Sequence, residues 1–127
     1  MRNISKDIEN LLVLPSVTIS ADGETTGAVI DYAGKYIGIC ATLYVGNYTA
    51  GKASLKLEVL DINDNATLVS DFESPSLEAN GNVNVNLSKY DLVQSGKKVR
   101  LSLVSANSSN FTASITLTGS TSEIDFA

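Results

Sequence analysis

The chain has 127 residues and a mass of 13.4 kDa, a length that fits one domain. It has no histidine and one cysteine, which excludes a Ser-His-Asp triad, a Cys-His pair, a histidine-ligated metal and an intrachain disulfide. A formal net charge of -5 and a pI near 4.5 argue against nucleic-acid binding, because neutralising phosphates needs clustered Lys and Arg.

Small polar residues take the place of charged ones. Only 18% of the chain is charged and 43% is hydrophobic, and the hydrophobic share suffices for one core at this length. The chain contains 16 serines, 10 threonines and 11 asparagines. The positions of these residues along the strands therefore decide what kind of surface the protein presents.

The N-terminal segment, residues 1–15, has a pattern of its own. Its apolar residues are Ile4, Ile8, Leu11, Leu12 and Leu14. The first four recur at i, i+4, i+7 and i+8, which predicts a short helix that ends before Pro15. Because two helical turns alone are marginal in water, we predict an arm that docks on its own domain or on a neighbour. We assign these five apolar residues to partner binding.

From residue 16 onward, apolar and polar residues alternate with a period of two. Loops are expected at residues 46–51, as a hairpin-type connection, and at residues 107–110. Residues 120–127 form a polar tail. The expected strands span residues 17–20, 27–32, 36–45, 55–59, 68–72, 83–87, 99–103 and 111–118. About eight short strands between closely spaced turns predict an all-β fold, a single antiparallel β-sandwich or jelly roll over residues 16–119.

The alternating strands carry Ser, Thr and Asn at their outward positions. Residues 82–86 read Asn-Val-Asn-Val-Asn, and Thr or Ser occupies every second position from Thr112 to Thr118. Such a face loses less free energy than a charged one when it is removed from water. We therefore interpret these faces as contacts with other copies in a lattice. The alternative interpretation is the ordinary preference of threonine for exposed strands.

One acidic segment resembles a calcium loop. Residues 61–65, Asp-Ile-Asn-Asp-Asn, match the opening of an EF-hand loop, but Ala66 and Phe72 stand where the loop needs glycine and glutamate. We predict a turn in which Asx side chains bond their own backbone, with calcium binding as the alternative. The remaining acids suggest no carboxylate pair for catalysis. We expect no catalytic, metal or cofactor-binding residue and no enzyme.

Aromatic residues and the cysteine admit structural and functional interpretations. Tyr32, Tyr36, Tyr44 and Tyr48 lie close together in the sequence, and β-sandwiches host carbohydrate sites. Packing in the core or at a strand rim is the interpretation we favour. Cys40 lies in an apolar run and is expected to be a buried small hydrophobe.

One stretch resembles a known family. Residues 19–34, ISADGETTGAVIDYAG, followed by Gly46-x-Tyr48-Thr49-x-Gly51, resemble small all-β structural proteins encoded in the head and neck regions of tailed bacteriophage genomes. The shared features are D-G-x-x-T-G, a short strand ending in Asp, a glycine turn and a long strand. The resemblance covers residues 17–65. The chain departs from the family afterwards, because its last strands are rich in Ser and Thr and carry Arg100 as their one arginine.

The resemblance implies a non-enzymatic virion protein. It implies a capsid decoration or cement protein that binds the major capsid protein and stabilises its lattice, often as a trimer, and that needs no cofactor. The charged N-terminus has no apolar signal core, so we expect synthesis in the host cytoplasm and no membrane or nucleic-acid partner. Two alternatives remain open: a tail or neck component, and a carbohydrate-binding or adhesion module.

Overall fold

The computed structural model describes residues 8–31, 38–87, 90 and 98–120, and this part of the chain contains strands and no α-helix. The strands are β1 (Ile8–Ile19), β2 (Gly23–Asp31), β3 (Gly38–Leu60), β4 (Ala66–Leu68), β5 (Ser76–Leu77), β6 (Gly81–Asn86) and β7 (Lys98–Ser120).

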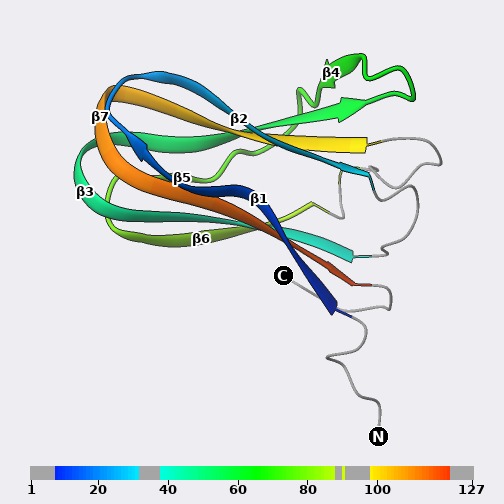
Figure 1. Cartoon of the computed structure of the whole chain (residues 1–127), viewed down its shortest axis with the longest axis horizontal. Coiled ribbons are helices and arrows are strands. Elements are labelled where there is room, and N and C mark those ends of the chain that lie inside the picture. The colour runs from blue at the N-terminus through cyan, green and yellow to red at the C-terminus, as the bar shows by residue number, and fades with distance from the viewer. Residues whose placement is uncertain (1–7, 32–37, 88–89, 91–97, 121–127) are drawn as a thin grey trace, which may run out of the picture.

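Two long strands organise the fold. β3 and β7 have 23 residues each and pair antiparallel along their length, from Gly38 opposite Ser120 to Leu60 opposite Lys98. Midway, the register of this pair shifts between Gly46 and Lys52. Both strands curve back on themselves at that point (Figure 1). Each strand therefore contributes one half to each of two packed layers.

The other strands add to one layer each. The first layer has the order β1, second half of β7, first half of β3, β6. The second layer has the order β2, first half of β7, second half of β3, then β4 and β5. β4 and β5 pair with different parts of the same edge of β3. Counted as one position, they complete four strand positions in each layer, which is the eight-strand arrangement of a jelly roll. The predicted fold class is confirmed.

The core lies between the two layers. It is built from alternate residues of each strand, because successive side chains of a strand point to opposite faces. The buried core side chains of β3 and β7 are Ile39, Ala41, Leu43, Val45, Ala53, Leu55, Leu57, Val99, Leu101, Leu103, Phe111, Ala113, Ile115 and Leu117. Leu43, Leu57, Leu103, Ile115 and Leu117 are fully buried.

The predicted N-terminal helix is wrong for residues 8–14, which belong to β1. The register of β1 against β7 shifts between Leu12 and Leu14 and again between Leu14 and Val17. These irregularities put both Val13 and Leu14 in the core. The helical spacing is misleading because it joins Leu11, which is half-buried, to Leu12, which is exposed on the opposite face of the strand. The expected boundary after residue 15 falls inside this strand. Ile4 lies outside the described residues, as does the predicted tail beyond Ser120.

The predicted hairpin at residues 46–51 is also wrong. The two halves of β3 pair with β7 and lie in different layers, so the segment is a corner within one strand. Asn47 and Gly51 adopt positive φ there, 48° and 102°. The loop predicted at residues 107–110 is likewise a corner within one strand, β7, where Asn107 and Ser108 adopt φ of 66° and 62°. The predicted strand at residues 68–72 is wrong apart from Leu68, because β4 spans Ala66–Leu68 and residues 69–72 belong to no strand.

Hydrogen bonds join the turn between β1 and β2 to the corner of β7, and we call this set of bonds the Asp22 clamp. The Asp22 carboxylate accepts hydrogen bonds from the backbone N–H groups of Ser108 and Ser109, at 3.0 and 2.9 Å. The Ser105 hydroxyl bonds the carbonyl oxygens of Ala21 and Gly23. The backbone N–H of Ser109, followed by that of Ser108, lowers the pKa of Asp22 below its usual 3.8.

This clamp predicts a pH-dependent stability. A carboxyl group whose pKa is lower in the folded state stabilises the fold above its unfolded pKa, and this contribution is lost as the pH falls through the folded pKa. Asp22→Asn should therefore lower the melting temperature near neutral pH, and the difference from wild type should shrink below about pH 4. Thermal unfolding followed by circular dichroism checks this. Glu78→Gln, which removes an exposed carboxylate beside β5, is the charge-matched control. A difference in melting temperature between Asp22→Asn and wild type that stays the same below about pH 4 would contradict a stabilising role of the Asp22 carboxylate.

Candidate functional site

The outward face of the second layer is charged, and its charges pair with one another. Lys56 lies 3.2 Å from Glu24, and Arg100 lies 3.0 Å from Glu58, which is 7% exposed. At the end of the layer, Lys98 bonds Asp64 at 2.8 Å. Exposed ion pairs such as Lys56–Glu24 contribute little to stability, and charged groups are costly to remove from water.

Among the residues that the structure describes, none on the outward face of the first layer is charged, and we call it the uncharged face. The pairing registers place the following fourteen residues on it, together with the buried Gly38 and Ser120 at its end. They are Asn10, Leu12 and Thr18 of β1; Thr112, Ser114, Thr116 and Thr118 of β7; Cys40, Thr42, Tyr44 and Gly46 of β3; and Asn82, Asn84 and Asn86 of β6. The predicted outward positions of residues 82–86 and 112–118 are thereby confirmed, and both sets lie on this one face.

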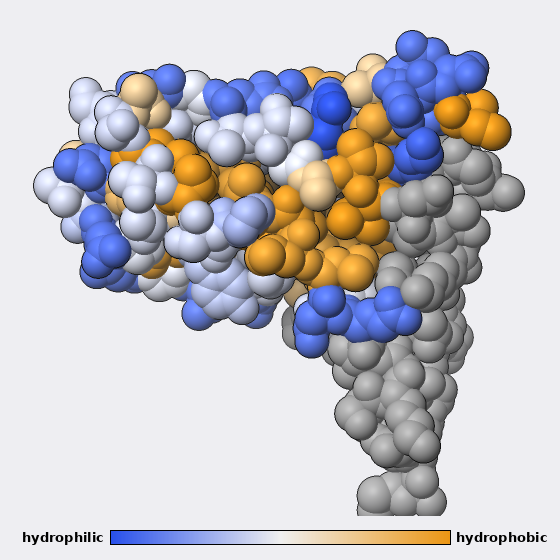
Figure 2. Space-filling view, in the orientation of Figure 1, coloured by the Kyte–Doolittle hydropathy of each residue, from blue (hydrophilic) through white to orange (hydrophobic). Residues whose placement is uncertain are grey.

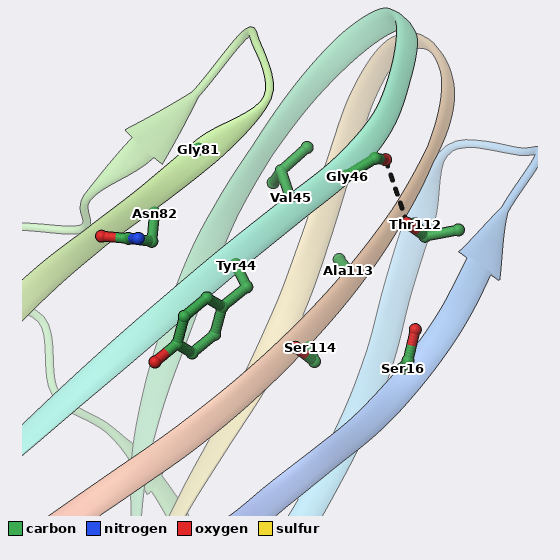
Figure 3. Close-up of a pocket in the computed structure, with 9 residues that line it drawn as sticks. All are labelled: Ser16, Tyr44, Val45, Gly46, Gly81, Asn82, Thr112, Ala113 and Ser114. Carbon is green, nitrogen blue, oxygen red and sulfur yellow. Dashed lines mark hydrogen bonds between the residues drawn. The ribbon is translucent and has the colours of Figure 1, made fainter.

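Tyr44 is the large aromatic residue of the uncharged face. It is 42% exposed, opposite Ser114 on one side and Asn82 on the other. Beside it lies an open pocket of about 310 Å³, formed by the first layer and lined also by Ser16, Gly46 and Thr112, among others. Figure 3 shows the ring lying along the sheet between Asn82 and Ser114. The Thr112 hydroxyl donates to the Gly46 carbonyl at 3.0 Å, which holds the rim of this pocket.

The hydroxyl and amide groups of this face already bond one another. Thr42 donates to the Asn84 side chain at 2.7 Å, and Thr118 donates to the Asn10 side chain at 2.9 Å. Their side chains are thus partly ordered before any partner arrives, which lowers the entropy cost of binding. The lack of charge on the described part of this face and its exposed tyrosine are two features that the centres of protein–protein interfaces share.

The five residues assigned to partner binding do not share one surface. Leu12 is 60% exposed and lies on the uncharged face, whereas Leu14 is 7% exposed and belongs to the core. Leu11 is half-buried against the core. Ile4 and the side chain of Ile8 lie outside the part that is described. Partner binding by this segment stays a prediction, and among the described side chains Leu12 is the one placed to make it.

Hydrophobic side chains also gather between the two layers, beside β1 and β2 (Figure 2). Val13, Leu14 and the half-buried Leu11 of β1 contribute to this core. The main role of β1 is therefore to cover one edge of the core. Its outward residues, Asn10, Leu12 and Thr18, belong to the uncharged face.

The tyrosines do not form a common platform. Tyr48 stacks on Phe111 at a ring distance of 6.4 Å and donates its hydroxyl to the Gly51 carbonyl at 2.8 Å, so it packs at the corner of β3. Tyr44 is exposed, and Tyr32 and Tyr36 lie outside the described residues. Cys40 is buried as predicted, and burial raises the pKa of its thiol.

The acidic segment at residues 61–65 is the predicted turn. The Asp61 carboxylate accepts hydrogen bonds from the backbone N–H groups of Asn63 and Asn65, at 2.8 and 2.9 Å. The Asn65 amide group adds a bond to its second oxygen at 3.1 Å. These bonds, led by the Asn65 backbone, lower the pKa of Asp61. The carboxylate thus holds the turn between β3 and β4.

The comparisons with known proteins show the fold. No protein family model matches the chain, and no characterised protein matches it in sequence. The structure of infectious bursal disease virus, Gx strain, matches 87% of this chain with a TM-score of 0.55 and 11% identity. The VP2 subviral particle of the same virus matches 90%, with a TM-score of 0.52 and 12% identity. This chain covers 32% of each viral chain, about a third of its length.

A third match is a bacterial appendage. The structure of Bacillus endospore appendages, a family of disulfide-linked pili, matches 91% of this chain and 90% of its own, with a TM-score of 0.48 and 12% identity. Among the residues described here, none forms a helix long and apolar enough to cross a membrane.

Proposed function

We propose that the chain is a non-enzymatic structural protein of a tailed-bacteriophage virion, a decoration or cement protein bound to the capsid lattice. The observation that carries the proposal is the uncharged face, which extends over all four strands of the first layer. The fold shared with particles of infectious bursal disease virus supports a role in a virion. The sequence resemblance to head and neck proteins supports the bacteriophage assignment.

The two outer faces then have different tasks. The uncharged face contacts the major capsid protein, because its hydroxyl and amide groups lose little free energy when they exchange water for protein partners. The charged second layer faces solvent, where paired ions remain hydrated. Bound across adjacent capsid subunits, the protein opposes their separation under internal DNA pressure. The trimeric arrangement implied by the sequence resemblance stays a prediction.

Thr116→Lys should weaken capsid binding. Thr116 lies near the middle of the uncharged face, opposite Leu12 of β1 and Thr42 of β3. A lysine ammonium there must be removed from water on binding, which costs at least about 1.4 kcal/mol, a tenfold loss of affinity. Capsids assembled without this protein are incubated with the purified chain. The bound copies per capsid and the capsid melting temperature are then measured.

Thr26→Lys is the matched control, because it adds the same charge to an exposed position of β2 in the second layer. It should bind as the wild type does. Equal binding by the two variants would show that the uncharged face is not the contact. A wild-type protein that leaves capsids unbound and binds tails would favour the tail alternative, and glycan binding lost in Tyr44→Ala would favour the carbohydrate alternative.

A further inference from the structure

The four outer edges of the two layers differ in how they are protected. Exposed strand edges invite pairing with other chains, and proteins block them with proline, charge, irregular register or shortness. β1 carries Pro15 and two register shifts. β2 carries the charged Glu24 and a register shift between Thr26 and Val29. β4 and β5 have three and two residues.

β6 has none of these protections. Its six residues, Gly-Asn-Val-Asn-Val-Asn, contain no proline and no charge, and its register with β3 is regular. Beyond β6, no further strand of the described chain continues the first layer. A six-residue strand of this composition is an edge able to accept another strand.

The backbone N–H and C=O groups of β6 point alternately toward β3 and away from it. The N–H of Leu87 donates to the carbonyl of Ile39 at 2.8 Å, so odd-numbered residues direct their N–H and C=O groups toward β3. Along an edge strand the alternate residues direct these groups outward. The outward set includes Asn82 and Asn84, whose side chains lie on the uncharged face.

The side chains of β6 suit pairing with an identical strand. The net charge of -5 makes two copies repel, but the neighbours of β6 on the uncharged face, Thr42 and Tyr44, carry no charge. Toward the core, Val83 and Val85 are only half-buried. A second strand beside β6 would cover both valines, which is favourable.

We propose that β6 pairs antiparallel with β6 of a second copy of this chain, around a two-fold axis. In one such register Asn82 stands opposite Asn84 of the second copy, and Val83 opposite its own equivalent. The two first layers then form one continuous sheet of eight strands with an uncharged outer face. Because the other described edges are protected, the pairing is symmetric and closes at two copies. This differs from the trimer implied by the resemblance and does not depend on the proposed function.

Sedimentation of the full chain in the absence of capsids tests the pair. Wild type should populate a species of about 26.8 kDa, twice the 13.4 kDa of one chain. Asn84→Pro removes an outward N–H and leaves the ladder with β3 intact, so it should raise the dissociation constant at least about tenfold. Asn84→Thr keeps the N–H and is the matched control, expected to remain paired.

A second variant separates lost pairing from lost folding. Asn82→Lys retains all backbone groups but brings like charges together across the axis, so it should also dissociate while its thermal unfolding stays close to that of Asn84→Thr. A wild type that sediments as one chain up to about millimolar concentration, well above the affinity of a specific pair, overturns the proposal. So does a species of two or three chains that Asn84→Pro leaves intact.

Discussion

Gly27→Ala is expected to lower the free energy of unfolding by about 3 kcal/mol, the upper part of the range for overpacked interiors. A Cβ at this position would lie 2.1 Å from the Leu101 carbonyl oxygen and 2.9 Å from Cγ1 of Val13. The first of these atoms belongs to the backbone of β7, which cannot rotate away. Gly27 also lies within the register shift of β2 against β7, between Thr26 and Val29. The alanine methyl would therefore push β2 away from the sheet.

Urea unfolding of Gly27→Ala and Gly46→Ala checks this expectation. At Gly46 the added Cβ meets only the Thr112 hydroxyl oxygen, at 3.2 Å. That atom is at the end of a side chain that can rotate if it gives up its hydrogen bond to the Gly46 carbonyl, so the control should lower the free energy of unfolding by about 1 kcal/mol. Equal losses in the two variants would mean that the close approach at Gly27 relaxes at little cost.

The requirement for glycine at position 27 shows what sequence alone can and cannot give. The D-G-x-x-T-G motif that ends at Gly27 predicts a turn followed by a strand, and the structure places Asp22 in the turn and the rest of the motif inside β2. The reason for the glycine is a contact with β7, more than seventy residues away. Contacts of this range depend on the layer arrangement, which local patterns do not specify.

The strand pattern was predictable where alternation is strict. Residues 82–86 and 111–118 alternate between apolar and small polar residues, and both segments are strands with the expected faces. The alternation fails at bulges. In β1 the irregular register places Val13 and Leu14 together in the core and leaves Leu12 exposed. The four apolar residues 11–14 therefore do not alternate, and a helical spacing fits some of them equally well.

The loop predictions at the two corners are wrong for a related reason. Glycine and asparagine at residues 46–51 signal positive φ equally well for a hairpin and for a bend within one strand. A bend forms here, and not a hairpin, because the segments before and after it both pair with β7 and not with each other. The abundance of uncharged side chains was visible in the composition, but their concentration on one layer, with the charges on the other, required the pairing of distant strands.

The position of Tyr44 illustrates the same limit for the candidate site. Period-two alternation within residues 36–45 places it outward, so its exposure could be expected. Its pocket could not, because Gly81 and Asn82 of β6 and Ser114 of β7 line it together with β3. The signal available from sequence was the lack of any charge around each of these positions.

Phe111→Ala is expected to have the largest effect, a loss of about 4 kcal/mol in the free energy of unfolding, because a large buried ring leaves a cavity. Phe111 is 1% exposed and lies where β7 enters the first layer, opposite Ile19 of β1. Its ring stacks on Tyr48 at 6.4 Å with an interplanar angle of 18°. Removal of the ring thus empties the core and withdraws the support of the β3 corner.

Phe72→Ala is the matched control for this loss. Phe72 is half-buried and meets Tyr90 edge to face at 5.4 Å, so its truncation should cost roughly half as much. Denaturant unfolding measures both. A Phe111→Ala loss no larger than that of Phe72→Ala would show that the corner collapses onto the vacated volume. Because Phe111 points away from the uncharged face, folded Phe111→Ala should still bind capsids as wild type does, whereas Thr116→Lys should fold normally and bind weakly. Phe111→Ala would then lower stability without affecting capsid binding, and Thr116→Lys would weaken binding without affecting stability. These two results would distinguish core residues from residues that contact the capsid.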